Sequence, residues 1–171
     1  MIQILQRQNS KIAQRQLKLR EHLWPDLDKK RLWLRKERAG FTTVPRSMPL
    51  ILSIIDSMSK GKPLSSTYLE LWCRAHDECL ITLTRQEELA FHSGFTGQRA
   101  ISTWRDRLRT LVELGFIETK PGPSGELSYA LLLNPYQVIK KHHGKKHSGI
   151  TEATYNALQQ RAIDIGADDL E

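Results

Sequence analysis

The spacing of apolar residues separates a polar N-terminal stretch from a regularly patterned remainder. Residues 1–20 carry a thin apolar series at helical spacing, which predicts one weakly amphipathic helix interrupted by Pro25. A second helix is predicted from Asp26 to Gly40, with Asp26 or Asp28 as its N-cap. The two helices together predict an extension rather than part of a core.

Helical spacing becomes regular from Ser47, which is expected to cap a helix that ends at Gly61. A second core helix follows, opened by a capping box between Thr67 and Glu70. The segment CLITL, residues 79–83, is short, apolar and β-branched, and it predicts a small strand.

The next stretch predicts two helices joined by a turn that contains glycines. The first helix begins with a capping box between Thr84 and Glu87 and ends at Gly94. Thr96 is expected to cap the second helix, which stops at Gly115.

The second of these helices has two distinct faces. Its apolar residues share one face at helical spacing: Ile101, Trp104, Leu108, Leu111 and Val112. A polar and cationic stripe runs along another face: Gln98, Ser102, Arg105 and Arg109. The apolar face predicts a core contact, and the stripe faces a partner or solvent.

Two strand-like runs follow, FIETK at 116–120 and ELSYALLL at 126–133, joined by PGPSG. A further helix is predicted from Pro135. The last predicted helix, TEATYNALQQRAIDIG, turns four residues inward: Tyr155, Leu158, Ala162 and Ile165.

The segment ITLTRQEELAFHSGFTGQRAISTWRDRLRTLVELGFIE, followed by ELSYALLL, resembles the winged helix-turn-helix family of DNA-binding domains over about residues 65–133. The resemblance implies a mostly α fold with a small antiparallel β-wing, here with N- and C-terminal helical extensions. We therefore expect a basic helical arm in residues 1–45, a winged-helix domain in 46–143, and a C-terminal helix with an acidic end in 144–171.

In that family the second helix of the motif enters the major groove, and the wing contacts the DNA backbone. Carried over to this chain, the base-edge candidates are Gln98, Arg99, Ser102 and Thr103. The phosphate candidates are Arg105, Arg109 and Lys120, and Thr96 joins the set as the expected cap. Arg and Gln can bond guanine and adenine in bidentate fashion, and Arg or Lys neutralises phosphate.

The distribution of charge along the chain also indicates a polyanionic binding partner. The net charge is +7, and residues 1–48 hold 12 Lys or Arg against 4 Asp or Glu, a local excess of +8. Residues 140–147 carry +4 and residues 148–171 carry −4. Such an excess of positive charge favours binding to nucleic acid or to an acidic membrane surface. For each single run of charges, a solvent-exposed surface without a partner is the alternative.

Several classes of protein are not expected. No apolar run approaches the roughly 18 residues of a membrane span, no signal-peptide core is visible, and only two cysteines occur, so a cytoplasmic location without membrane contact is predicted. Cys73, His76, Cys79 and His92 supply zinc-binding donors at an irregular spacing, and two buried thiols with a surface histidine are the preferred interpretation. No metal is expected, because the spacing of these donors is irregular. No cofactor and no enzymatic activity are expected, because neither a P-loop nor a nucleophile elbow is present.

The sequence therefore predicts a double-stranded DNA-binding protein that acts as a transcriptional regulator. It is similar in arrangement to regulators and replication initiators encoded by bacterial plasmids and integrative elements. A replication or partition factor of a mobile element, and a winged-helix protein-interaction module without DNA contact, remain alternatives. A homodimer is a further candidate state, and the basic arm could serve either DNA binding or dimerisation.

Overall fold

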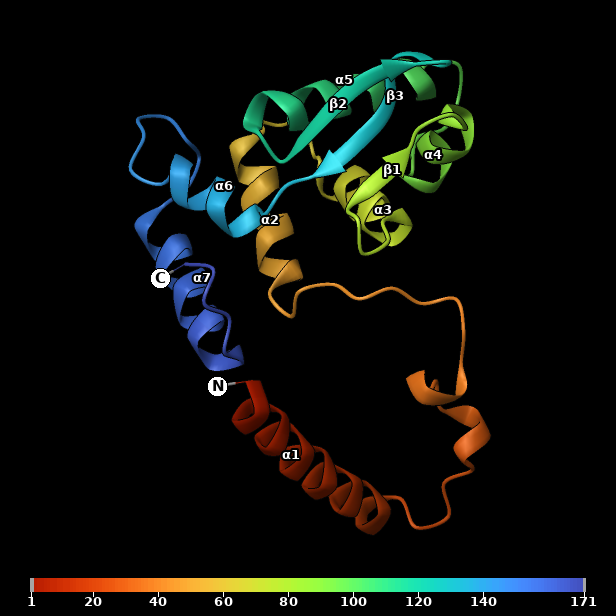
Figure 1. The fold of residues 1–171 in the computed structure, drawn as a ribbon, viewed down its shortest axis with the longest axis vertical. Coiled ribbons are helices and arrows are strands. Elements are labelled where there is room, and N and C mark those ends of the chain that lie inside the picture. Colours follow the sequence, from red (N-terminus) through yellow and green to blue (C-terminus); the bar gives the residue numbers. More distant parts are fainter. Residues whose placement is uncertain (1, 171) are drawn as a thin grey trace. The chain divides into compact units, whose positions relative to one another are not determined.

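The computed structural model describes residues 2–170, with side-chain surroundings from residue 11 onward. Backbone contacts divide the chain into two compact units, residues 1–41 and 42–171. Among the described residues there are seven α-helices and one three-stranded antiparallel sheet, drawn in Figure 1. The fold is therefore mixed: a helix-rich unit with a β-hairpin, preceded by a helical arm.

The arm contains the predicted first helix, α1 (Ile2–Leu23), but the predicted second helix is wrong. Only two single 3-10 turns form there, Lys29–Arg31 and Arg35–Glu37. Asp28 does cap the first turn, since its side chain accepts from the Lys30 amide at 2.9 Å. Trp33 remains 62% exposed, so a helix here would have no packed face to stabilise it.

The arm helix α1 is also the longest helix, with 22 residues, and it is rich in glutamine and basic residues. Within residues 2–170, no helix combines the length and the apolar character that a membrane crossing requires.

The second unit holds the remaining elements, each in a segment where the sequence predicts an element of that type. The helices are α2 (Met48–Met58), α3 (Ser65–Arg74), α4 (Gln86–His92), α5 (Ala100–Leu114), α6 (Pro135–His142) and α7 (Glu152–Ile165). The strands are β1 (Leu80–Thr82), β2 (Ile117–Gly122) and β3 (Gly125–Leu132).

The sheet has the order β1-β3-β2, so the short strand before α4 pairs with the returning strand of the hairpin. Ile81 lies opposite Ala130, and both are buried, whereas the neighbouring pair Leu80 and Leu131 is exposed. One face of the sheet therefore joins the helices in a single core. The hairpin requires glycine at position 122, because a Cβ there would come within 2.6 Å of the Tyr129 ring.

The capping box predicted for α3 is wrong. Thr67 lies inside the helix, fully buried, and its hydroxyl has no hydrogen-bond partner among the described residues. The helix is capped instead from α2, where one Asp56 carboxylate oxygen accepts from the Leu64 amide at 2.7 Å and the Ser65 amide at 2.9 Å. These two backbone donors have no partner inside the helix, and the carboxylate supplies one.

The predicted caps of α4 and α5 are wrong as well. The N-cap positions are Arg85 and Arg99, and neither helix has a side-chain capping bond. Thr84 and Thr96 lie outside the cap positions, because each helix begins later than the sequence pattern predicts. Glu87 lies in the first turn of α4 instead, where a negative charge favours the helix dipole.

Helices α6 and α7 pack against α2, beside the C-terminal end of the chain in Figure 1. Ser47, the predicted cap of α2, makes no capping bond, and its hydroxyl is hydrogen-bonded to the Tyr136 hydroxyl of α6. Asn134 caps α6 and Thr151 caps α7 through their side chains. The predicted inward face of α7 is buried at Tyr155, Leu158 and Ala162, and Ile165 is half-buried.

Candidate nucleic-acid interface

The helix α5 is held in the core by one face. Trp104, Leu108 and Leu111 are fully buried, at the spacing i, i+4 and i+7 that the sequence predicts. Ile101 is half-buried and Val112 is 36% exposed, so these two lie at the margin of the buried face. These three large side chains fix the rotation of α5 about its own axis, so the face of the helix opposite them points away from the core.

That opposite face carries three of the predicted contact residues, Ser102, Arg105 and Arg109, all exposed. Their spacing of three and four residues places them on one side of the helix. Thr103 is half-buried beside this face. The structure therefore brings the polar and cationic stripe together on the surface of the second unit.

The turn between α4 and α5 presents three more of the predicted residues. Thr96, Gln98 and Arg99 are exposed and precede the first helical residue. Gly94 and Gly97 both have positive φ angles, 87° and 81°, which side chains on an L-residue rarely allow. The two glycines let the chain reverse and leave Gln98 and Arg99 at the open end of α5.

Lys120 does not join this group. It lies on the exposed face of β2 together with Glu118, alternating with the buried Ile117. The residues facing the core alternate with the outer ones along a strand, so Lys120 points to the solvent side of the sheet. Its role as a phosphate contact stays a prediction.

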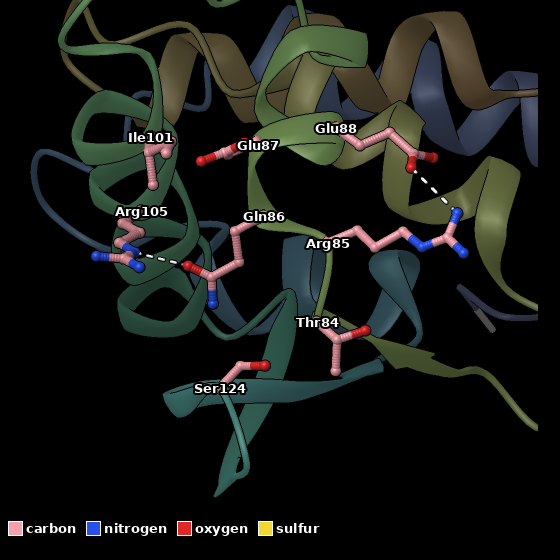
Figure 2. A pocket seen from close by; sticks show the side chains of 8 residues that line it. All are labelled: Thr84, Arg85, Gln86, Glu87, Glu88, Ile101, Arg105 and Ser124. Atoms are coloured by element: carbon pink, nitrogen blue, oxygen red, sulfur yellow. Dashed lines mark hydrogen bonds and ion pairs between the residues drawn. The ribbon is translucent and has the colours of Figure 1, made fainter.

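A groove runs between the start of α4, the exposed side of α5 and the tip of the hairpin (Figure 2). It has a wider part of about 500 Å³ and a narrower part of about 180 Å³. Gln86, Arg105 and Ser124 line both parts, one from each of the three elements or the turn beside them. Two of the predicted contact residues, Arg105 and Arg109, therefore lie in the lining of this groove.

Gln86 is a residue that the sequence does not single out. It is only 8% exposed, and its side chain bridges three elements. Its Oε1 accepts from Arg105 Nε of α5 at 2.7 Å, the dashed contact in Figure 2, and its Nε2 donates to the Leu127 carbonyl of β3 at 2.9 Å. A polar residue in the first turn of an amphipathic helix gives no sequence signal of burial, because its partners lie far along the chain.

The acidic residues near the groove are partly neutralised. Glu88 accepts from Arg74 Nη2 at 2.9 Å and from Arg85 Nη1 at 3.3 Å. The hydrogen bond from Arg74 holds the pKa of Glu88 below its ordinary value. Glu87 and Glu126 line the two parts of the groove and form no ion pair within residues 11–170.

The charge balance differs between the two parts of the groove. The lining of the wider part contains two arginines, Arg85 and Arg105, and two glutamates, Glu87 and Glu88, so its charges balance. The narrower part is lined by two cations, Arg105 and Arg109, and by one carboxylate, Glu126, while Asp106 pairs with Arg109 from outside the lining.

Arg109 is less available than Arg105. Its Nη1 forms an ion pair with Asp106 at 2.9 Å, and both side chains are more than half exposed. Exposed pairs of this kind contribute little, and water or a phosphate can displace them. In Arg105 the terminal nitrogens make no hydrogen bond with another described residue, because Gln86 binds only Nε.

The expected burial of the cysteines is wrong. Cys73 and Cys79 are both free and exposed, and His76 is exposed as predicted. Cys79 lies before β1 and has a left-handed backbone conformation (φ 56°). No group of three or more His, Cys, Asp or Glu residues suited to a metal ion occurs in the described part of the chain.

No protein-family profile, no curated protein and no solved structure matches this chain. What the protein binds must therefore be inferred from the α5 face and the groove.

Proposed function

We propose that residues 42–171 contain a winged helix-turn-helix domain that binds double-stranded DNA, and that the protein acts as a transcriptional regulator. The observation that supports this is the outward face of α5, which carries Ser102, Arg105 and Arg109, and of which the two arginines also line the groove. The order of helix, strand, helix, helix and hairpin, with the sheet order β1-β3-β2, is compatible with that domain.

The proposed mode of binding follows from the dimensions of DNA. The major groove is about 12 Å wide and admits an α-helix. With the N-terminal end of α5 inserted, Gln98 and Arg99 reach base edges, and Arg105 and Arg109 lie further along, where phosphates pass. The hairpin tip at Ser124 then runs beside the DNA backbone. The +8 charge of residues 1–48 adds attraction without sequence preference.

Four single substitutions test this mode on a preferred duplex, found by selection from a random library, and on random duplexes. Gln98→Ala and Arg99→Ala are each expected to cost about 1–3 kcal/mol on the preferred site, relax base choice and change random-duplex binding little. Arg105→Ala and Arg109→Ala should weaken all duplexes alike and lower the salt slope by about one each.

Binding is measured at several salt concentrations, and unfolding midpoints are measured for every variant. A destabilised helix is then not mistaken for a lost contact. Unchanged DNA binding in all four folded variants would refute the groove-reading mode.

That result would favour the second candidate, a protein-interaction module. The observation on its side is Phe91, an aromatic residue on α4 that is 65% exposed. Phe91→Ala should then abolish partner binding and leave the fold intact. A replication or partition factor is distinguished by its DNA site: it should select repeated sites, whereas a regulator should select a short, often palindromic one.

A further inference from the structure

The side chain of Gln86 has both of its polar ends occupied by specific partners. Its amide oxygen binds Arg105, 19 positions later in the chain, and its amide nitrogen binds the Leu127 carbonyl, 41 positions later. The carbonyl can only accept, and the guanidinium can only donate, so the orientation of the Gln86 amide is fixed by chemistry. A flipped amide would lose both bonds.

This arrangement restrains Arg105. An arginine side chain on a helix surface ordinarily samples many rotamers and loses that freedom on binding. Here the Nε of Arg105 is held at 2.7 Å by a side chain that is itself 8% exposed. The guanidinium plane is therefore restrained before any ligand arrives, and Arg105 lies beside Gln86 in the lining of the groove (Figure 2).

We propose that the narrower part of the groove is a binding site for a DNA phosphodiester, in which Gln86 is the positioning residue for Arg105. This inference rests on the proposed DNA-binding function and assigns a role to a residue outside the predicted contact set.

The surroundings suit a phosphate. This part of the groove encloses about 180 Å³ and is lined by two guanidinium groups and the Glu126 carboxylate, with Asp106 paired to Arg109. Arg105 can offer its terminal N–H groups, and Arg109 can exchange its exposed partner Asp106 for phosphate. The Ser124 hydroxyl at the hairpin tip makes no hydrogen bond with another described residue and lines the same space.

The bond to β3 has a consequence for the hairpin. Because Gln86 binds the Leu127 carbonyl and Arg105 together, the distance between the hairpin and α5 is tied to the direction of the guanidinium. A phosphate held by Arg105 therefore lies at a defined position against the hairpin tip. Preorganisation of this kind raises affinity by lowering the entropy lost on binding.

A double-mutant cycle on the full-length chain tests the proposal with a random duplex as the probe. Gln86→Met keeps a similar volume and removes both hydrogen bonds, and Arg105→Ala removes the guanidinium. Each single variant should weaken binding by roughly three- to tenfold, and Gln86→Met in the Arg105→Ala background should add nothing further, as expected for residues in contact. The matched control is Arg109→Ala, one turn away and without a hydrogen bond to Gln86, whose coupling with Gln86→Met should be weaker than that of Arg105→Ala.

A second variant covers the case in which Gln86→Met does not fold. Gln86→Glu retains an acceptor for Arg105 but places a negative charge against the guanidinium. It should weaken DNA binding and lower the salt slope by about one, as loss of one phosphate contact does. An unchanged slope in folded Gln86→Glu would overturn the proposal.

The outcomes separate this proposal from the function on which it rests. A wild-type chain that binds no duplex refutes DNA binding itself. A chain that binds DNA while the effects of Gln86→Met and Arg105→Ala are additive overturns the positioning role alone. The nuclear magnetic resonance signal of the Arg105 Nε proton gives an independent readout without DNA: slow exchange in the wild type and fast exchange in Gln86→Met support the proposal, and fast exchange in both overturns it.

Discussion

Substitution of Asp56 by alanine tests how the second unit is held together. One oxygen of this carboxylate accepts from two backbone amides at the start of α3, at 2.7 and 2.9 Å. A hydrogen bond to a charged group contributes about 1.5–3 kcal/mol, and loss of a helix cap costs about 0.5–2 kcal/mol. Because Asp56 is half-buried and water can reach the freed amides, we expect Asp56→Ala to lower the free energy of unfolding by about 2 kcal/mol.

Thr67→Val provides a control of opposite sign. The Thr67 side chain is fully buried, and its hydroxyl has no partner, so the hydroxyl is desolvated without compensation. Valine has nearly the same shape and removes that group. We therefore expect Thr67→Val to leave stability unchanged or to raise it by up to about 1 kcal/mol.

The measurement is urea unfolding followed by far-ultraviolet circular dichroism, with the slope of the transition compared between variants. The reasoning fails if Asp56→Ala changes the free energy of unfolding by less than about 0.5 kcal/mol, the size of an ordinary surface effect. If Thr67→Val lowers the free energy of unfolding by about 1 kcal/mol, the result would support the capping box that the sequence predicts.

Three further predictions concern the arm, metal content and acid stability. Deletion of residues 1–40 should weaken binding to specific and random duplexes alike and flatten the salt dependence; a truncated chain that turns monomeric and keeps its salt slope would identify the arm as a dimerisation element. Protein purified without added zinc should contain no stoichiometric zinc by metal analysis, and one equivalent lost together with the fold on chelation would contradict this. Glu88→Gln should make the free energy of unfolding less dependent on pH below about 4.5. The reason is that the hydrogen bond from Arg74 lowers the pKa of Glu88 in the folded state. The stability that this carboxylate contributes is present above its unfolded-state pKa and is lost as the pH falls through its folded-state pKa. Urea midpoints from pH 7 downward measure it, and parallel curves for wild type and variant would count against it.

The sequence by itself determined the elements whose signals are local. The buried face of α5 follows from the spacing of Trp104, Leu108 and Leu111, and its end follows from Gly115, which adopts a left-handed conformation with φ 82°. The hairpin follows from two β-rich runs around PGPSG. These features depend on residues within a few positions of one another, so periodicity and turn chemistry are sufficient to predict them.

Tertiary structure alone decided which polar groups meet. The amides at the start of α3 are capped by Asp56 from the preceding helix, although Thr67 and Glu70 fit a capping box in sequence. Gln86 is buried because Arg105 and the Leu127 carbonyl come together around it from distant parts of the chain. A buried polar side chain is stable only where it has a hydrogen-bond partner in suitable geometry. The sequence near Gln86 does not encode where α5 and β3 will lie, so it cannot predict these partners.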